Sequence, residues 1–128
     1  MQAIIELDTT ERYRINAYMH SKAIINAVQR PFIRVSAFDN AEITLNVSEG
    51  SLAHAHLTHN TSLTVNANDN AAVNIIANAA SQLILNANNE SYVAAKMYGN
   101  TSASYTQSGT STLIINNFGG STSMNLPT

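Results

Sequence analysis

The amino-acid sequence predicts an all-β protein that forms a single parallel β-solenoid of about six coils, with twenty residues and two unlike strands per coil. Three observations predict this fold. Apolar and polar residues alternate over short stretches, which is typical of strands with one buried face. This alternation recurs every ten residues, and a finer pattern recurs every twenty. Residues that favour turns, mainly Asn, Asp, Gly, Ser and Thr, fill the intervals.

The inward-facing residues are predicted by dividing the chain into blocks of ten. The third, fifth and seventh places of a block are predicted to face the core, as in Ile43, Leu45 and Val47. A helix, with 3.6 residues per turn, would not keep a register of ten along the chain. The pattern starts in the first block and weakens after Asn100. The weak inward candidates are Ala103, Tyr105, Gln107, Leu113, Ile115 and Asn117.

The finer period of twenty comes from the sixth place of alternate blocks, which holds Asn. Strands that stack in register place identical residues above one another, about 4.8 Å apart. Stacked Asn amides can then bond to one another along the axis, as they do in cross-β assemblies. We therefore predict a structural Asn ladder. Its members are Asn26, Asn46, Asn66 and Asn86.

The length of 128 residues suits one domain. We predict a solenoid domain over residues 1–120 and a C-terminal tail or cap over 121–128, where the alternation is lost. The alternative architecture is a trimeric β-prism in which three chains share one core. Because the first block is already in register, the edge of the first coil is expected to be covered by a protein partner or by a homo-oligomer.

Composition excludes several classes of protein. Charged residues make up 11% of the chain and the formal net charge is -2, so clustered Lys and Arg for a nucleic-acid surface are not expected. The chain has no Cys, which excludes disulfides and thiolate metal sites. No apolar run approaches the roughly 20 residues that span a bilayer. The N-terminus is not that of a signal peptide, so we expect a cytoplasmic protein of the producing cell or a virion component.

Two sets of residues are candidates for a ligand or partner face. Arg14, Arg34 and His54 stand twenty residues apart, and His56 shares the outward face of His54. They predict a basic patch for an acidic partner or a sugar acid, with Glu11 and Asp39 as candidate neutralising groups. The second set is an aromatic stripe, which could bind a sugar or a protein but is expected to close a corner of the core. Its members are Tyr18, Phe32, Phe38, Tyr92, Tyr98 and Phe118.

No enzyme, cofactor or metal is predicted. His54 and His56 could contribute two metal ligands, but the sequence specifies no third one. The sequence has no catalytic Cys, no GxSxG, no HExxH and no glycine-rich phosphate loop.

The repeat resembles that of β-solenoid repeat proteins over about residues 1–118. Stretches such as YGNTSASY also resemble, more loosely, Asn/Ala-rich repeat proteins of phages and mobile elements. The low charge, the lack of a signal peptide and of a catalytic constellation, and the uncapped first coil lead us to expect a non-enzymatic structural or adhesive protein, such as a phage fibre, spike or decoration component that self-assembles or binds a surface partner. A protein-binding module that inhibits an intracellular protein and a carbohydrate-binding solenoid are the alternatives.

Overall fold

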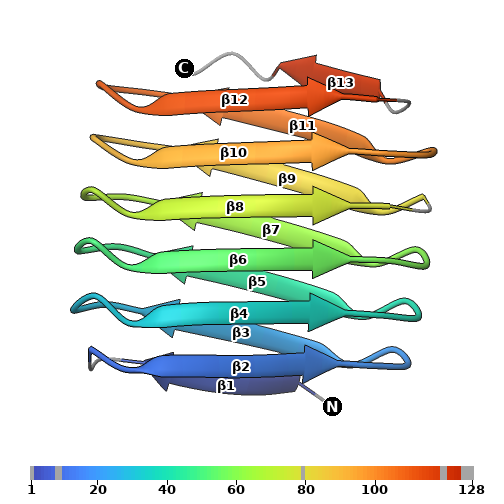
Figure 1. Ribbon diagram of the computed structural model, residues 1–128, viewed down its shortest axis with the longest axis horizontal. Helices are drawn as coiled ribbons and strands as arrows, with labels where there is room; N and C mark the ends of the chain where they lie inside the picture. The colour runs from blue at the N-terminus through green and yellow to red at the C-terminus, as the bar shows by residue number, and fades with distance from the viewer. Residues whose placement is uncertain (1, 8–9, 79, 119–120, 125–128) are drawn as a thin grey trace.

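The computed structural model describes residues 2–7, 10–78, 80–118 and 121–124, and it shows a β-solenoid whose coils stack along one axis (Figure 1). Each coil contributes one strand to each of two parallel sheets. The sheet with strand order β1-β3-β5-β7-β9-β11-β13 is called sheet A, and the sheet with order β12-β10-β8-β6-β4-β2 is called sheet B. The strands are β1 (Gln2–Leu7), β2 (Arg12–Ala17), β3 (Lys22–Ala27), β4 (Phe32–Ala37), β5 (Glu42–Val47), β6 (Leu52–Leu57), β7 (Ser62–Ala67), β8 (Ala72–Ala77), β9 (Gln82–Ala87), β10 (Tyr92–Met97), β11 (Ser102–Gln107), β12 (Thr112–Asn117) and β13 (Ser121–Met124).

The register between coils is twenty residues from β1 to β12. In sheet A, Leu45 lies beside Val65, and in sheet B, Ala55 lies beside Ile75. The predicted parallel solenoid with two strands per coil is therefore confirmed. Both sheets come from one chain, so the alternative of a trimeric prism with a shared core is wrong.

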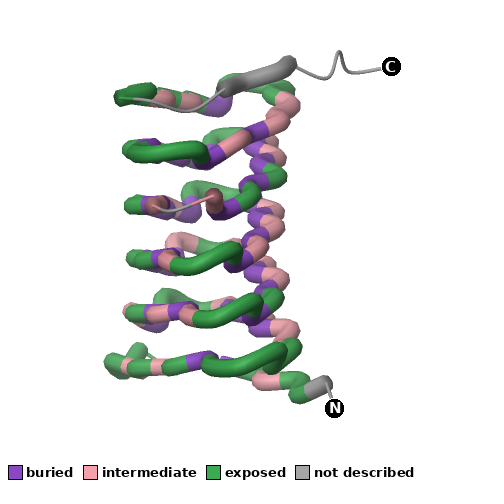
Figure 2. Tube along the Cα trace, turned by 90° about the vertical axis from the view of Figure 1, so that its right-hand side faces the viewer, coloured by how far each residue is buried: buried purple, intermediate pink, exposed green. Residues whose placement is uncertain are grey.

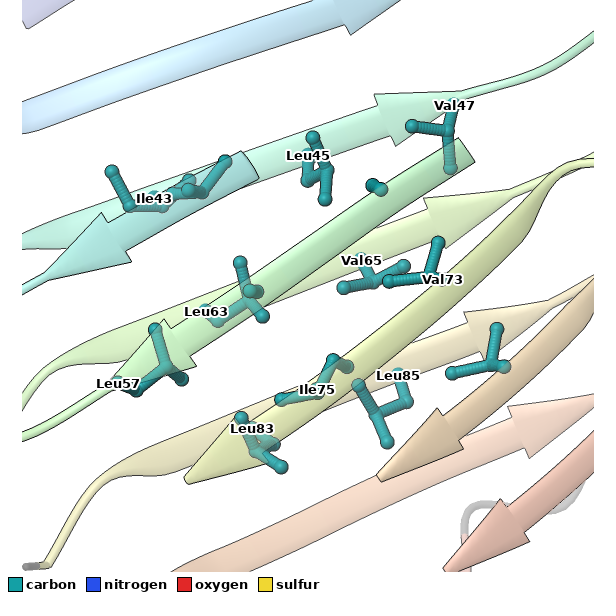
Figure 3. Packing of buried hydrophobic residues seen from close by; sticks show 14 of the residues in the cluster. Ile43, Leu45, Val47, Leu57, Leu63, Val65, Val73, Ile75, Leu83 and Leu85 are labelled. Carbon is teal, nitrogen blue, oxygen red and sulfur yellow. The ribbon is translucent and has the colours of Figure 1, made fainter. Parts of the chain in front are cut away.

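The core fills the space between the two sheets (Figure 3). Inward residues from both sheets, such as Leu45, Leu57 and Leu85, are fully buried, and each buried aliphatic side chain contributes about 1.5–3 kcal/mol to folding. Buried and more exposed residues alternate along the strands (Figure 2). The third, fifth and seventh places are buried from β4 to β10, as predicted.

The end coils depart from this pattern. Ile15 and Leu113 are only half-buried, because a coil at an end has a neighbour on one side alone. Gln107 and Asn117 were predicted to face inward but are exposed. Their side chains are polar, and the end of the core can leave them in water without losing apolar contacts.

The first place of a block is also buried from Pro31 to Ser111, which the alternation did not predict, whereas Glu11 and Ser21 near the end of the solenoid are exposed. It holds a small residue in every block from Pro31 onward, including Ala41, Ser51, Thr61 and Ala71. The hydroxyls of Ser51, Ser81, Thr101 and Ser111 donate to the backbone carbonyl three residues earlier, whereas the Thr61 hydroxyl pairs with that of Ser81 and the buried Ser91 hydroxyl has no hydrogen-bond partner among the described residues. The Ser51 hydroxyl, for example, donates to the Ser48 carbonyl at 2.6 Å. Only a small side chain fits where the chain turns into the next strand. The recurrence of small residues at the first place could therefore have predicted its burial.

The turns between strands are tight and similar to one another. In the turns that follow β2 to β7, the residues at the ninth and tenth places both have positive φ, such as Asp39 (53°) and Asn40 (67°), whereas in the turns after β9, β10 and β11 only the ninth-place residue does. The backbone N–H of Ala41 donates to the carbonyl of Phe38 at 3.2 Å and closes the turn. Two consecutive positive φ angles are those of a type I′ turn, which Asn, Asp and Gly adopt at low cost. This explains why these residue types recur between the strands.

The Asn column on the outer surface of sheet A forms a continuous chain of hydrogen bonds. The Nδ2 amide of each Asn donates to the Oδ1 of the Asn one coil earlier, and each of these three bonds is 2.8 Å long. The chain extends beyond the four residues. At one end Asn26 donates to Glu6 at 3.1 Å, and at the other end Thr106 donates to Asn86 at 2.6 Å. The ladder thus joins six coils and fixes their register.

The C-terminal segment was predicted to be a tail or cap over 121–128. Ser121–Met124 forms β13, which pairs with β11 and continues sheet A. This pairing joins Ser102 to Ser121 and so runs at nineteen residues rather than twenty. Residues 125–128 of that prediction lie outside the described residues. Within the part of the chain that the structure describes, no helix is long and apolar enough to cross a membrane.

The ladder generates a stability prediction. Asn66→Asp removes the amide that donates to Asn46 and places a carboxylate oxygen against the Asn46 Oδ1 oxygen. We expect a loss of about 1–3 kcal/mol in the free energy of unfolding, measured by urea denaturation. Asn74→Asp, on the outer surface of sheet B, is the matched control and should change the stability by less than about 0.5 kcal/mol. Equal effects of the two substitutions would show that the ladder does not stabilise the fold.

Candidate basic groove on sheet B

Charge is distributed unequally over the surface. The strands of sheet B contain four of the six basic residues of the chain and none of its eight acidic residues. The acidic residues that the structure describes lie in sheet A or in segments outside the strands. One outer surface is therefore basic in a protein whose formal net charge is -2. The basic residues of sheet B are Arg12, Arg14, Arg34 and Lys96.

The stacking of coils pairs charges on sheet A but not on sheet B. On sheet A, Lys22 lies beside Glu42, and the Nζ–Oε2 distance is 3.4 Å. On sheet B, Arg14 lies beside Arg34. Among the described residues, neither Arg14 nor Arg34 forms an ion pair. Two exposed guanidinium groups therefore stand in adjacent coils, about 4.8 Å apart at the backbone, without a counter-charge.

The two carboxylates proposed to neutralise these arginines have other partners. Glu11 accepts a hydrogen bond from the Tyr13 hydroxyl at 3.4 Å. Asp39 lies 3.9 Å from the ring of His59. Both acids lie outside the strands, whereas the arginine side chains point outward from the middle of their strands, so the predicted neutralisation is wrong.

Arg14 and Arg34, which we call the arginine column, line part of an open groove with a volume of about 450 Å³. We call it the basic groove, lined on β2, β4, β6 and β8 by Arg14, Asn16, Arg34, Ser36, His54, His56, Asn74 and Ile76, with Val35 and Ala55 beneath. Successive Cα partners on these strands are Arg14, Arg34, His54 and Asn74. The predicted set Arg14, Arg34, His54 and His56 thus lies together on one surface. The volume lies within the range typical of small-ligand sites.

A phenylalanine packs against two side chains on one side of this surface. The ring of Phe32 lies 5.9 Å from the guanidinium carbon of Arg12 and 5.4 Å from the ring of His54. A cation over an aromatic face is stabilised by the charge distribution of the ring. A smaller hollow of about 210 Å³, lined by Arg12, Tyr13, Arg14, Phe32 and Arg34, adjoins the groove. The arginines thus separate two hollows on one continuous surface.

The six aromatic residues do not form one stripe. Tyr18 stacks on Phe38 with ring centroids 5.2 Å apart, and Tyr98 stacks on Phe118 at 5.0 Å. Thr58 and Asn78 occupy the same place in the coils between these pairs.

Phe32 and Tyr92 belong to a different column, at the start of their strands. The expectation that the rings close a corner of the core is wrong, since Tyr18 and Phe118 are 52% and 62% exposed. The small residues at the first place fill that corner instead.

The histidines do not gather into a metal site. His54 and His56 lie in the basic groove, whereas His59 lies in a turn, with its Nδ1 3.2 Å from the Thr58 hydroxyl. In the described ranges no three His, Cys, Asp or Glu side chains group as metal ligands do.

The sequence analysis did not identify five outward residues of this surface: Arg12, Asn16, Ser36, Asn74 and Ile76. The sequence could have indicated them, because they stand at the second, fourth and sixth places of their blocks. Residues at these places stack at intervals of twenty, just as Arg14 and Arg34 do.

In our comparisons, no protein-family model, curated protein or solved structure matched this chain.

The unpaired arginines generate a second stability prediction. Because Arg14 and Arg34 repel each other across adjacent strands, Arg34→Gln should leave the free energy of unfolding unchanged or raise it by about 0.5 kcal/mol at low salt. The measurement is urea denaturation in 10 mM and 500 mM NaCl (about 30 Å and under 5 Å of screening length). A loss above about 1 kcal/mol would assign Arg34 a structural role and contradict the idea that it is free for a ligand.

Proposed function

We propose that this protein is a non-enzymatic structural or adhesive protein that binds an anionic surface partner through the basic groove. The observation that carries the proposal is the arginine column. Arg14 and Arg34 repel each other and contribute no ion pair among the described residues, so a role in folding does not account for them. On sheet A, by contrast, Lys22 has Glu42 as its partner in the next coil.

The scaffold suits such a role. Both sheets consist of short, regular strands held in register by backbone bonds, and the Asn ladder adds a side-chain constraint. Residues displayed on the outer surface are therefore held at fixed spacing before a ligand arrives, which lowers the entropy cost of binding. A rigid adhesive surface is consistent with a phage fibre, spike or decoration component, the setting expected from the sequence.

A second candidate function is recognition of an acidic protein by the same surface. Leu52 and Ile76 are 45% and 42% exposed and lie on β6 and β8, beside the histidines. Apolar residues next to basic ones are found at protein interfaces. An inhibitor of another protein would use them as apolar contacts around the arginines.

The proposal predicts selective and salt-sensitive binding to polyanions. The protein should bind immobilised polygalacturonate and polyglutamate but neither neutral dextran nor polylysine, and added salt should weaken the binding. We expect Arg14→Gln with Arg34→Gln to weaken binding by about tenfold or more, since each charge-assisted bond to an anion contributes strongly. Surface plasmon resonance measures these affinities.

The matched control combines Lys22→Gln and Arg30→Gln, which lowers the net charge equally but lies outside sheet B. This control should bind within about twofold of the wild type, because screening limits the reach of exposed charges. Equal weakening by the two double variants would mean that net charge, and not the basic groove, drives binding. Absence of binding to either polyanion would overturn the proposal.

A further inference from the structure

We infer that the ligand of the basic groove is a linear carboxylated polysaccharide, which lies across the strands and along the solenoid axis. This inference rests on the proposed function and adds to it the class of ligand, its direction and the number of units it contacts.

The direction follows from the arrangement of two arginines and one histidine. Arg14, Arg34 and His54 occupy one place in three successive coils, so they form a row perpendicular to the strands. Their backbone spacing is set by the coil repeat, about 4.8 Å. A ligand that meets all three must run along the solenoid axis and carry an acidic group at each step.

The spacing between coils distinguishes between the possible polyanionic ligands. An extended peptide places side chains of one face about 6.8 Å apart, so its carboxylates would fall out of step with the row after two residues. In a linear polysaccharide with one carboxylate per sugar, the repeat is the length of one pyranose unit, which is close to the distance between coils. Successive units are rotated about the chain axis, so their carboxylates do not all project to one side, but the long side chains of Arg14 and Arg34, one coil apart, can reach the carboxylates of neighbouring units.

The walls of the groove match sugar hydroxyls. Asn16 and Ser36 lie beside the row and Asn74 continues it, and none of the three forms a side-chain hydrogen bond among the described residues. Amide and hydroxyl groups both donate and accept, as sugar hydroxyls require. A helical acidic partner would have a similar spacing between i and i+4, but it would pack mainly through apolar contacts, and the outward residues of the row are polar.

Aromatic rings lie on both sides of the row. Phe32 is at the start of β4, and the stacked rings of Tyr18 and Phe38 lie beyond Asn16 and Ser36 in their coils. Exposed rings offer an apolar face to the C–H groups of a sugar ring. This places them at the edges of a polysaccharide that follows the arginine column.

The test is calorimetry with oligogalacturonates and oligomannuronates of one to six units. Affinity should rise with each unit up to three or four and then level off, because the row has three steps, Arg14, Arg34 and His54, followed by Asn74. Arg34→Gln should weaken binding of the tetramer by about tenfold. Lys22→Gln, the control on sheet A, should weaken it by less than about twofold. Methyl esters of the same oligomers, which lack the charge, should bind at least about tenfold more weakly.

Three results would overturn the inference. Polyglutamate that binds as tightly as a uronate of equal charge would leave the proposed function intact and identify an acidic protein as the partner. Affinity that rises evenly to six units would contradict the three-step row. If neither the uronates nor polyglutamate bind, the inference and the proposed function fail together.

Discussion

Parallel backbone pairing between successive coils is the constraint on which the rest of this structure depends. The strands from β1 to β12 pair with one another at a spacing of twenty residues, so each side chain lies beside the residue at the same place in the neighbouring coil, and only the pairing of β11 with β13 runs at nineteen. A slip of one residue would exchange the buried and exposed faces. The core residues, the small residues at the first place and the Asn ladder are all consequences of keeping this register.

The same constraint turns a local sequence choice into an extended surface. Residues of one type at intervals of twenty form columns. The side chains of a column either hydrogen-bond to one another or face outward without such partners. Asn amides satisfy one another because each has both a donor and an acceptor. Guanidinium groups have donors alone, so the side chains of Arg14 and Arg34 cannot hydrogen-bond to each other. The contrast between these two columns supports a structural role for one and a binding role for the other.

The fold could be predicted from the sequence because its period is carried by many residues at once, as in Ile43, Leu45 and Val47 and their equivalents. The grouping of Arg14, Arg34, His54 and His56 followed from the same period. The aromatic corner could not be predicted, since periodicity places a residue in a column but does not say whether the column lies inside or outside a bend. The neutralising role of Glu11 and Asp39 failed for a related reason. Proximity in sequence to the arginines did not bring these turn residues to the middle of the strands.

The most direct test of the account is to compare two deletions. Removal of residues 61–80 takes out one coil and joins Asn60 to Ser81, which keeps every place in register. Removal of 61–75 takes out fewer residues but joins Asn60 to Ile76, which shifts all later places by five. The account predicts that the larger deletion gives a folded β-protein with cooperative thermal unfolding by circular dichroism, and that the smaller one does not. A folded 61–75 deletion with an unfolded 61–80 deletion would contradict the claim that a twenty-residue register holds the molecule together.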